Sequence, residues 1–231
     1  MTAPVGTAPN FNRLAAPYRW MEYLSFGPAL ERCRFHFLSR LDHCRYGLVL
    51  GDGDGRFTAR LLATHPDLRV HAIDGSPAML TALRRRVAAV AAAHRLTTQL
   101  ADLRLPDLHL GNTTSPSDPS LPFTPDCIAT HFFLDCLTTP EVARLAHSLS
   151  ALAAPGCLWI VSEFAIPARG WMRPLAAALV AALYRAFGWL TGLQPQQLPD
   201  HPSALAASGW QCIQRHRHLG GLLVSELWLL R

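Results

Sequence analysis

The sequence contains no lysine, and all 21 of its basic residues are arginine. This absence excludes chemistry that depends on a lysine amine, such as a Schiff base or the phosphate-binding lysine of a P-loop. Charged residues are scarce as well, at 16% against about 25% in an average soluble domain. The net charge of +5 is too mild to indicate a nucleic-acid partner, and the dense basic run at 84–86 is predicted to lie on a solvated helix face.

Paired cysteines and long apolar runs are also missing. The six cysteines form no C-x-x-C pair, which argues against a zinc site or a disulfide framework and predicts reduced thiols in a cytoplasmic protein. The first residues show no basic stretch followed by an apolar run, so a secretory signal is not expected. The apolar stretch 174–184 is far shorter than the ~20 residues that span a bilayer.

Half of the residues are hydrophobic, which suffices for one large core. Apolar runs alternate with helical patterns, and this alternation is typical of parallel βαβ units. The pattern predicts an α/β fold with a doubly wound, mostly parallel seven-stranded sheet, a helical segment after strand five and a closing antiparallel hairpin. Strands are expected at 47–50, 69–73, 96–101, 127–130, 158–164, 210–216 and 222–230, and helices at 56–63, 77–94, 139–153, 171–190 and 203–207.

Glycines and acids follow the predicted strands where such sheets bind ligands. The first strand runs into Gly51-Asp52-Gly53-Asp54-Gly55, a loop whose glycines allow close approach of backbone to a ligand. Asp74 ends the second strand and can accept hydrogen bonds from both hydroxyls of a ribose. Asp102 ends the third strand and is placed to accept from an adenine amino group. The alternatives are a tight turn, a helix cap and a solvated acid; together the features favour nucleoside binding.

The segments LVLGDGDGRF, AIDGSPAML, LADLRLP, PDCIATHFFLDCL and LAAPGCLWIVSEF, which fall in this order within 47–164, resemble the class I S-adenosylmethionine-dependent methyltransferases. The resemblance implies a Rossmann-like methyltransferase fold and S-adenosylmethionine as cofactor. It implies that the glycine loop supports the methionine part, Asp74 the ribose and Asp102 the adenine. The implied cofactor-binding residues are Gly51, Asp52, Gly53, Gly55, Asp74, Gly75, Ser76, Met79, Asp102, Leu103, His131, Phe132 and Tyr18.

The flanking regions resemble the ubiquinone/menaquinone C-methyltransferase branch more weakly. The stretch FNRLAAPYRWMEYLSFG implies aromatic residues that cover the cofactor, and 166–209 implies a lid. The expected organisation is one domain over 1–231, with a helical cover at 1–45, a cofactor-binding core at 46–164, a lid at 165–209 and a hairpin at 210–231. One position departs from the family: Val49 stands where an acid usually anchors the cofactor, and Asp52 or Asp54 is expected to substitute.

Candidate acid–base residues follow the fourth strand. His131 and Asp135 are expected to point into the site and to move a proton if the acceptor carries one. The alternatives are a histidine packed against the adenosine and, for Asp135, a cap on the next helix. Glu163 is a third candidate because a buried acid needs a partner or a raised pKa. His36 is expected at the surface more than in the site.

The helical segment 171–190 is apolar on nearly every face. Such a helix is either extra core or a lid over an apolar acceptor, and its end residues Trp171, Arg173, Arg185 and Trp189 also suit a membrane surface. The favoured function is methyl transfer to a small, mainly apolar molecule such as a quinone precursor, lipid or aromatic metabolite. Two other functions stay open: a non-catalytic binding subunit of the same fold, and a nicotinamide-dependent oxidoreductase. The oxidoreductase is disfavoured because the dinucleotide-binding motif G-x-G-x-x-G requires a glycine at position 56, where this sequence has Arg56.

Overall fold

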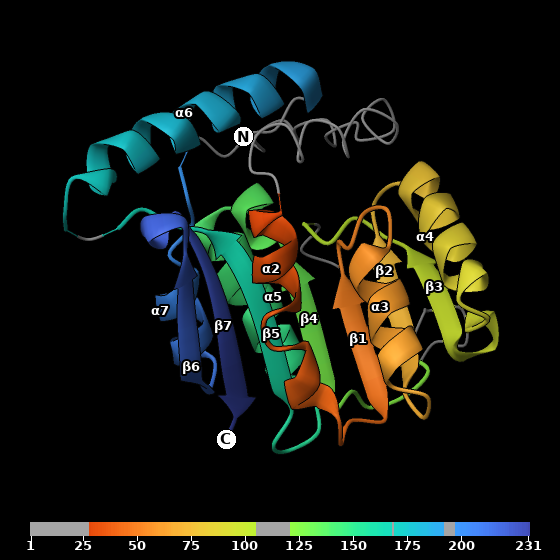
Figure 1. Cartoon of the computed structure of the whole chain (residues 1–231). Coiled ribbons are helices and arrows are strands. Elements are labelled where there is room, and N and C mark those ends of the chain that lie inside the picture. The colour runs from red at the N-terminus through yellow and green to blue at the C-terminus, as the bar shows by residue number, and fades with distance from the viewer. Residues whose placement is uncertain (1–27, 105–120, 168, 192–196) are drawn as a thin grey trace, which may run out of the picture.

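A computed structural model describes residues 28–104, 121–167, 169–191 and 197–231. These residues form an α/β fold around one seven-stranded sheet (Figure 1). The strand order is β3-β2-β1-β4-β5-β7-β6, in which β1 to β5 run parallel and β7 and β6 antiparallel. The predicted fold class is therefore confirmed. The strands are β1 Tyr46–Leu50, β2 Arg69–Asp74, β3 Leu96–Leu100, β4 Cys127–His131, β5 Leu158–Phe164, β6 Trp210–His218 and β7 Leu223–Leu230.

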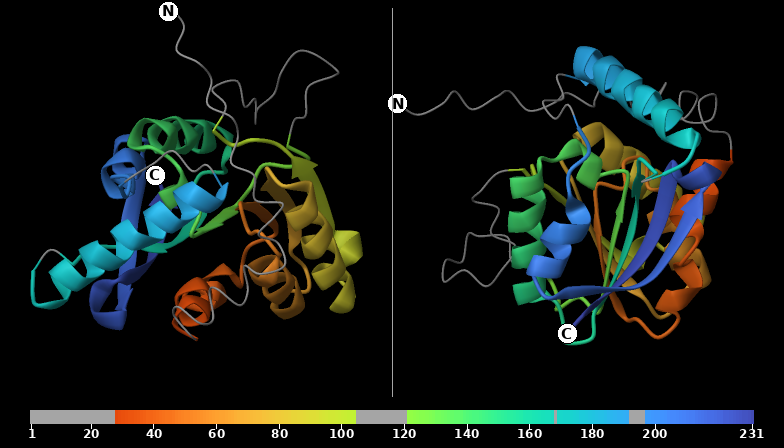
Figure 2. Two further views of the ribbon diagram at one scale, coloured as in Figure 1. Left: turned by 90° about the horizontal axis from the view of Figure 1, so that it is seen from above. Right: turned by 90° about the vertical axis from the view of Figure 1, so that its left-hand side faces the viewer.

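Helices cover both faces of this sheet (Figure 2). One face carries α2 Ala29–Phe35, α3 Arg56–Thr64 and α4 Pro77–Ala89, and the other carries α5 Thr139–Leu152 and α7 His201–Ala207. The longest described helix, α6 Met172–Thr191, lies above the edge at which the parallel strands end. Short 3-10 turns complete the described chain: η2 Leu38–Leu41, η3 Ala93–Arg95, η4 Leu134–Cys136 and η5 Leu219–Gly221.

The buried core divides between the two faces because successive strand residues point to opposite sides. Leu48 and Leu50 of β1 pack with the α5 and α7 side, whereas Val49 between them packs with α3 and α4. Val49 is only 1% exposed, so an apolar residue fits its surroundings. The position that departs from the family is thus part of the core.

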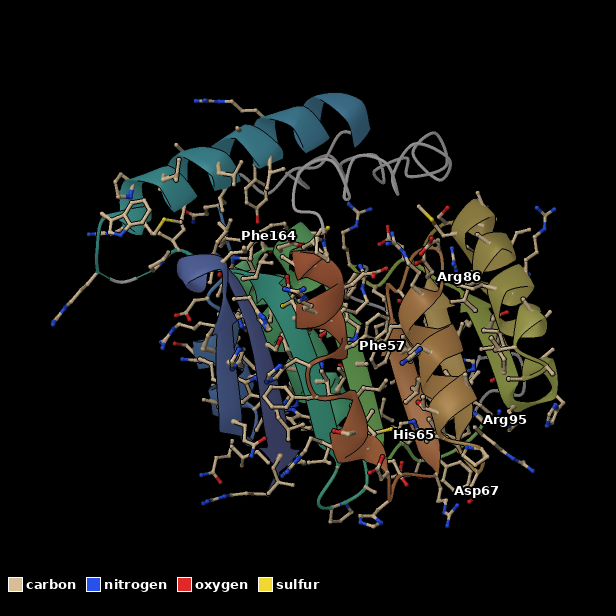
Figure 3. The ribbon with its side chains drawn as sticks, in the orientation of Figure 1. Phe57, His65, Asp67, Arg86, Arg95 and Phe164 are labelled. Atoms are coloured by element: carbon tan, nitrogen blue, oxygen red, sulfur yellow. The ribbon has the colours of Figure 1, made fainter. Side chains whose placement is uncertain are left out.

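Helix α4 is shorter than predicted. It ends at Ala89 instead of continuing to 94, and Ala91 takes a left-handed conformation with φ of 56°. The chain then turns back, and the guanidinium of Arg95 (labelled in Figure 3) donates to three carbonyls at the end of α3 and just after it. These carbonyls belong to Leu62, His65 and Leu68, at 2.8 to 3.1 Å.

Candidate active site

The glycine loop joins β1 to α3 at the point where the strand order reverses, with β2 on one side of β1 and β4 on the other. Ligands bind at such switch points in open α/β sheets. Gly55 has φ of 80°, and a Cβ there would lie 2.6 Å from the Leu83 backbone, so α4 can pack only on a glycine. Gly53 also has a positive φ, yet a Cβ would meet only Met79 Sδ, at 3.9 Å. The backbone at Gly53 is therefore open to an adjoining cavity.

The two acids within the loop hold its conformation. The Asp52 carboxylate accepts the backbone N–H groups of Phe57 and Thr58 at the start of α3. Asp54 forms ion pairs with Arg56, at 3.1 Å, and with Arg86, at 2.7 Å. The expectation that 84–86 is a solvated face is thus wrong for Arg86, which reaches back from α4 to the loop (Figure 3). Both loop acids line the cavity while carrying these internal bonds.

Asp74 ends β2 beside the glycine loop and also lines the cavity. Its carboxylate accepts the backbone N–H groups of Gly53, at 3.2 Å, and Ser76, at 2.8 Å. Burial raises the pKa of Asp74 to about 6, although both N–H donors favour the ionised form. Ser76 caps α4 by accepting from the Met79 backbone N–H. The two hydrogen bonds thus fix the orientation of the carboxyl group, and its pKa of about 6 lies near neutral pH.

Asp102, after β3, is held by Arg104. The guanidinium donates from Nε and Nη2 to both carboxylate oxygens, at 2.9 and 2.7 Å. These hydrogen bonds lower the pKa of Asp102 and keep it ionised. Both residues line the cavity, so this edge carries an ion pair and not a lone acid.

His131 ends β4 in the cavity wall and is only 4% exposed. Its Nδ1 lies 2.9 Å from Ser162 Oγ, and that hydroxyl donates to the Cys33 carbonyl at 3.2 Å. Because the hydroxyl proton is committed, Nδ1 must carry the hydrogen and donate it. Nε2 then holds the lone pair and has no partner among the described residues. Burial, followed by the charge of Arg34, lowers the pKa of His131 well below its usual value, so the ring is neutral.

The segment after His131 is built to turn side chains into the cavity. Phe132 has φ of 53°, a costly conformation for an aromatic residue. The buried Glu163 carboxylate accepts the N–H groups of Phe133, Leu134 and Asp135, at 2.9 to 3.3 Å. Glu163 is absent from the cavity lining described here, so the structure gives this candidate base a positioning role.

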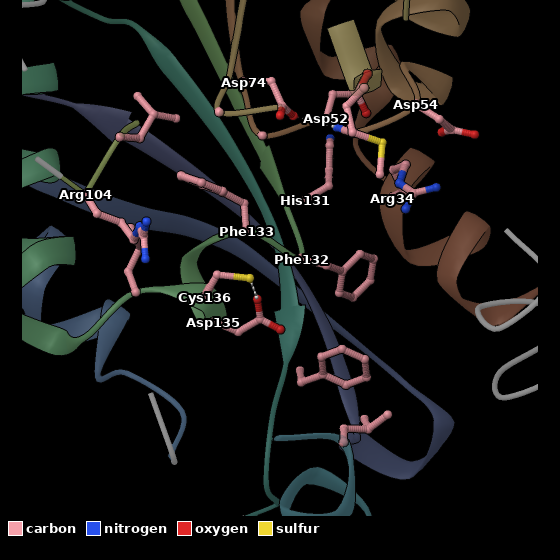
Figure 4. Close-up of a pocket in the computed structure, with 18 of the residues that line it drawn as sticks. Arg34, Asp52, Asp54, Asp74, Arg104, His131, Phe132, Phe133, Asp135 and Cys136 are labelled. Atoms are coloured by element: carbon pink, nitrogen blue, oxygen red, sulfur yellow. Dashed lines mark hydrogen bonds between the residues drawn. The ribbon is translucent and has the colours of Figure 1, made fainter. Parts of the chain in front are cut away.

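Asp135 does line the cavity (Figure 4). Burial raises its pKa to about 6, and the Cys136 thiol donates to its Oδ1 at 3.5 Å. The alternative that Asp135 caps the next helix is wrong. Helix α5 is capped by Thr138, which forms a capping box with Glu141.

The outer wall of the cavity comes from α6. Val180, Leu183 and Tyr184 face inward, and the Tyr184 hydroxyl donates to the Asp135 carbonyl at 2.8 Å. The other side of α6 faces solvent, since Trp171 is 81% and Leu175 is 55% exposed. Helix α6 is therefore not a core helix. Among the described helices, none has the length and hydropathy needed to span a bilayer. The Trp189 side chain lies outside the described residues.

Arg34 of α2 is one of the cavity residues that the sequence does not predict. It is 6% exposed and its guanidinium lies 5.7 Å from the centre of the Phe132 ring. No motif surrounds it, and only the packing of α2 on β7 brings it here. His36, two residues on, lies outside the cavity lining and stacks on His216, as the surface alternative expected.

The structure thus gathers most of the predicted residues around one cavity of about 230 Å³ (Figure 4). Gly55 and Ser76 are not among the residues that line it, and Tyr18 falls outside the described residues. The predicted residues that line the cavity are Gly51, Asp52, Gly53, Asp74, Gly75, Met79, Asp102, Leu103, His131, Phe132 and Asp135.

Comparison with known families agrees with this geometry. Residues 48–159 match a family model described as a methyltransferase domain, and this range contains the glycine loop, Asp74, Asp102 and His131. The matched segment, just under half of the chain, is thus similar to a class I S-adenosylmethionine-dependent methyltransferase domain. Comparison with curated protein sequences gives no significant match.

Solved structures of methyltransferases share the fold of this domain. An O-methyltransferase family protein from Burkholderia thailandensis has a TM-score of 0.68 at 15% identity, over 95% of this chain and 60% of that chain. The mitomycin 7-O-methyltransferase has a TM-score of 0.68 at 15% identity, over 98% and 61%. The N-methyltransferase NodS from Bradyrhizobium japonicum has a TM-score of 0.56 at 15% identity, over 87% and 96%.

The low identity and partial coverage of these neighbours mean that their substrates cannot be assigned to this chain. The chain spans less than two thirds of the length of the two O-methyltransferases. Identities this low show a shared fold. The neighbours are O- and N-methyltransferases, so they give no support to the weaker resemblance to the ubiquinone/menaquinone C-methyltransferase branch.

Proposed function

We propose that this protein binds S-adenosylmethionine and transfers its methyl group to a small, mainly apolar molecule. One observation carries the proposal: the open backbone at Gly53, the Asp74 carboxyl and the unpartnered Nε2 of His131 border the same cavity. A side chain at position 53 would project a Cβ into the cavity, and the buried Nε2 of His131 has no hydrogen-bond partner among the described residues. Both features are expected of a site that binds a ligand.

The cofactor half of the cavity lies over β1, β2 and β3. Asp74 in its ionised form accepts hydrogen bonds from vicinal ribose hydroxyls, and Met79 and Leu103 offer apolar contact to a base. The Asp102–Arg104 pair fixes the polar edge on which an adenine amino group is recognised. Bound S-adenosylmethionine supplies a methyl group that its positive sulfur already activates.

The acceptor half lies under α6. Its walls are aromatic and aliphatic, from Phe132, Phe133, Phe164 and Leu183, with Tyr184 at the rim. Such a lining favours a flat or greasy molecule and excludes water, which keeps the reacting groups aligned. We propose a quinone precursor, a lipid or an aromatic metabolite as the acceptor class. The similarity to a mitomycin 7-O-methyltransferase supports a small-molecule acceptor.

The chain also offers a proton acceptor to such a molecule. His131 is neutral, and its Nδ1–H is held by Ser162, so Nε2 is free to accept a proton from a hydroxyl or amine. Asp135 is the second candidate, because its carboxyl lines the acceptor half and has a pKa of about 6.

The proposal is tested first by binding. Calorimetry with S-adenosylhomocysteine should show one site per chain, and Asp74→Asn should weaken it about 10- to 100-fold through loss of one or two charged hydrogen bonds. Asp67→Asn is a matched control, because this acid is exposed at the far end of β2. Equal affinity of wild type and Asp74→Asn would overturn the ribose assignment.

Transfer is tested with S-adenosylmethionine carrying a labelled methyl group and a panel of phenols, hydroxyquinones and aromatic amines. His131→Asn keeps an amide near Ser162 but removes Nε2, so we expect turnover to fall by about 10²- to 10⁴-fold with little change in S-adenosylhomocysteine affinity. Binding of the cofactor without transfer to the panel or to extracts would favour the non-catalytic binding subunit.

A further inference from the structure

A second group of histidines lies outside the cavity, at the edge of the sheet. His36 follows α2, and His216 and His218 lie on β6. Residues two apart on a strand project from the same face, and α2 covers that face beside β7. Three imidazoles from distant parts of the chain therefore meet at one place, with ligand nitrogens within 4.8 Å of one another.

We propose that His36, His216 and His218 bind one divalent transition-metal ion, such as Zn²⁺, Ni²⁺ or Cu²⁺. Imidazole nitrogens suit these ions, whereas Mg²⁺ and Ca²⁺ require oxygen ligands. A tetrahedral ion with Zn–N bonds of about 2.0–2.1 Å places its ligand nitrogens about 3.4 Å apart. The observed spacing is close enough for side-chain rotation alone to complete the site, with water in the remaining position.

The hydrogen bonds of His218 prepare it as a ligand. Its Nε2 lies 2.9 Å from Ser225 Oγ, and that hydroxyl donates to the Cys33 carbonyl at 2.7 Å. Nε2 must then be the protonated nitrogen and Nδ1 the one with a free lone pair. A hydrogen-bonded second nitrogen is the usual companion of a metal-binding histidine, because it fixes the tautomer and the ring direction.

The electrostatics of the group agree with this role. The rings of His36 and His216 stack with their centres 4.1 Å apart, and His218 stands edge-on to both. Burial and the neighbouring histidine lower the pKa values of His36 and His218, so these rings are neutral near pH 7. Because the first two rings are nearly parallel, one of them must turn before both bind the same ion. His36 and His216 are exposed, so such a turn meets little resistance.

The set formed by the buried Cys44 and Cys127 and the half-buried Asp126 is a contrasting case. Its carboxylate already accepts the N–H groups of Arg45 and Tyr46. The hydrogen bond with the Cys44 thiol and then burial raise the pKa of Cys127 well above its usual value, which opposes the thiolate that a metal requires. The histidine group has neither obstacle.

The test uses the full chain after treatment with a chelator. Calorimetry at pH 7.5 with Zn²⁺ and with Ni²⁺ should show one ion per chain, and Mg²⁺ should not bind. His216→Ala should weaken Zn²⁺ binding at least tenfold, since even loss of an outer partner of a ligand costs about 10- to 100-fold. His147→Ala on α5 is the matched control, an exposed histidine far from the group in sequence, and should bind as wild type does.

Two further readouts separate this site from binding elsewhere on the chain. The spectrum of bound Cu²⁺ should report several nitrogen ligands in wild type and lose them in the double variant His36→Ala/His216→Ala. Zn²⁺ at about 100 times its dissociation constant should raise Tm by about 5 to 10 °C in wild type and much less in that variant. Unchanged Zn²⁺ affinity in the double variant, or no binding by wild type, would overturn the proposal.

Discussion

Asp74 is the residue whose environment most directly sets a measurable property. Burial raises its pKa to about 6, above the ordinary 3.8. Between these values the native carboxyl holds a proton that the unfolded chain has released, so its contribution to stability falls as pH rises through this window. The ionised form is the one that accepts ribose hydroxyls, and binding must therefore expel that proton.

We accordingly predict that the affinity for S-adenosylhomocysteine rises between pH 5 and pH 7, with its midpoint near 6. Asp74→Asn cannot titrate and should give a weaker, flatter profile. Calorimetry over this pH range checks the prediction. A profile in the variant as steep as that in wild type would assign the titration to another group, such as Asp135.

At this scale the sequence predicts most directly the residues that stand next to strand ends. Asp74, Asp102 and His131 were predicted because a parallel sheet delivers its strand ends to one edge. Arg34 and Arg104 carry no motif, and the contact of each depends on the three-dimensional path of the chain. Glu163 was found as a buried acid, but only the structure shows that three backbone N–H groups occupy it.

The strand-to-helix loop is the element in which packing and binding can be separated. Gly55→Ala should destabilise the fold by several kcal/mol, because its Cβ would overlap the Leu83 backbone. Gly53→Ala should cost only about 1–2 kcal/mol for its positive φ and still weaken S-adenosylhomocysteine binding, because its Cβ enters the cavity. Thermal unfolding and calorimetry on both variants measure the two effects, and equal loss of Tm in the two would contradict this division.

Helix α6 is joined to the site by the hydrogen bond from Tyr184 to the Asp135 carbonyl. Tyr184→Phe should cost about 0.5–1.5 kcal/mol, a Tm decrease of roughly 2–4 °C per kcal/mol. Amide hydrogen exchange in α6 should quicken, and KM for the acceptor should rise more than the dissociation constant of S-adenosylhomocysteine. Tyr46→Phe, at the opposite end of the sheet, is the control; unchanged exchange in α6 would show that this bond does not hold the helix.

Element boundaries show what the sequence could not predict. Ser76 before Pro77 correctly marked the start of α4, because a cap and an N-terminal proline are local signals. The alanine-rich stretch after Ala89 has no stop signal in the sequence, and the contacts that Arg95 makes with carbonyls at the end of α3 join residues about 30 positions apart. For 171–190, the hydropathy of the sequence fits a core helix and a lid helix equally well. The two can be distinguished only by the position of the helix in the structure, above the ends of the parallel strands with one face exposed.

The outer face of α6 gives the whole molecule an asymmetric surface. Trp171 and Leu175, one helical turn apart, are exposed, and the exposed Arg185 lies on the same face of α6, in a chain of net charge +5. We propose a peripheral membrane contact here. The protein should float with vesicles containing anionic lipid and lose most of that binding in Trp171→Ser/Leu175→Ser. Phosphatidylcholine vesicles should bind weakly, and equal flotation of the variant would exclude this face.

A single peptide oxygen links the two sites described above. The carbonyl of Cys33 receives the hydroxyls of both Ser162 and Ser225. Those hydroxyls in turn dictate which nitrogen is bare in His131 and in His218. The Cys33 carbonyl on α2 therefore sets which ring nitrogen carries the proton in both histidines, one at the cavity and one at the sheet edge. A movement of α2 would change both hydrogen bonds together, so we expect a ligand bound at either site to change the affinity of the other site.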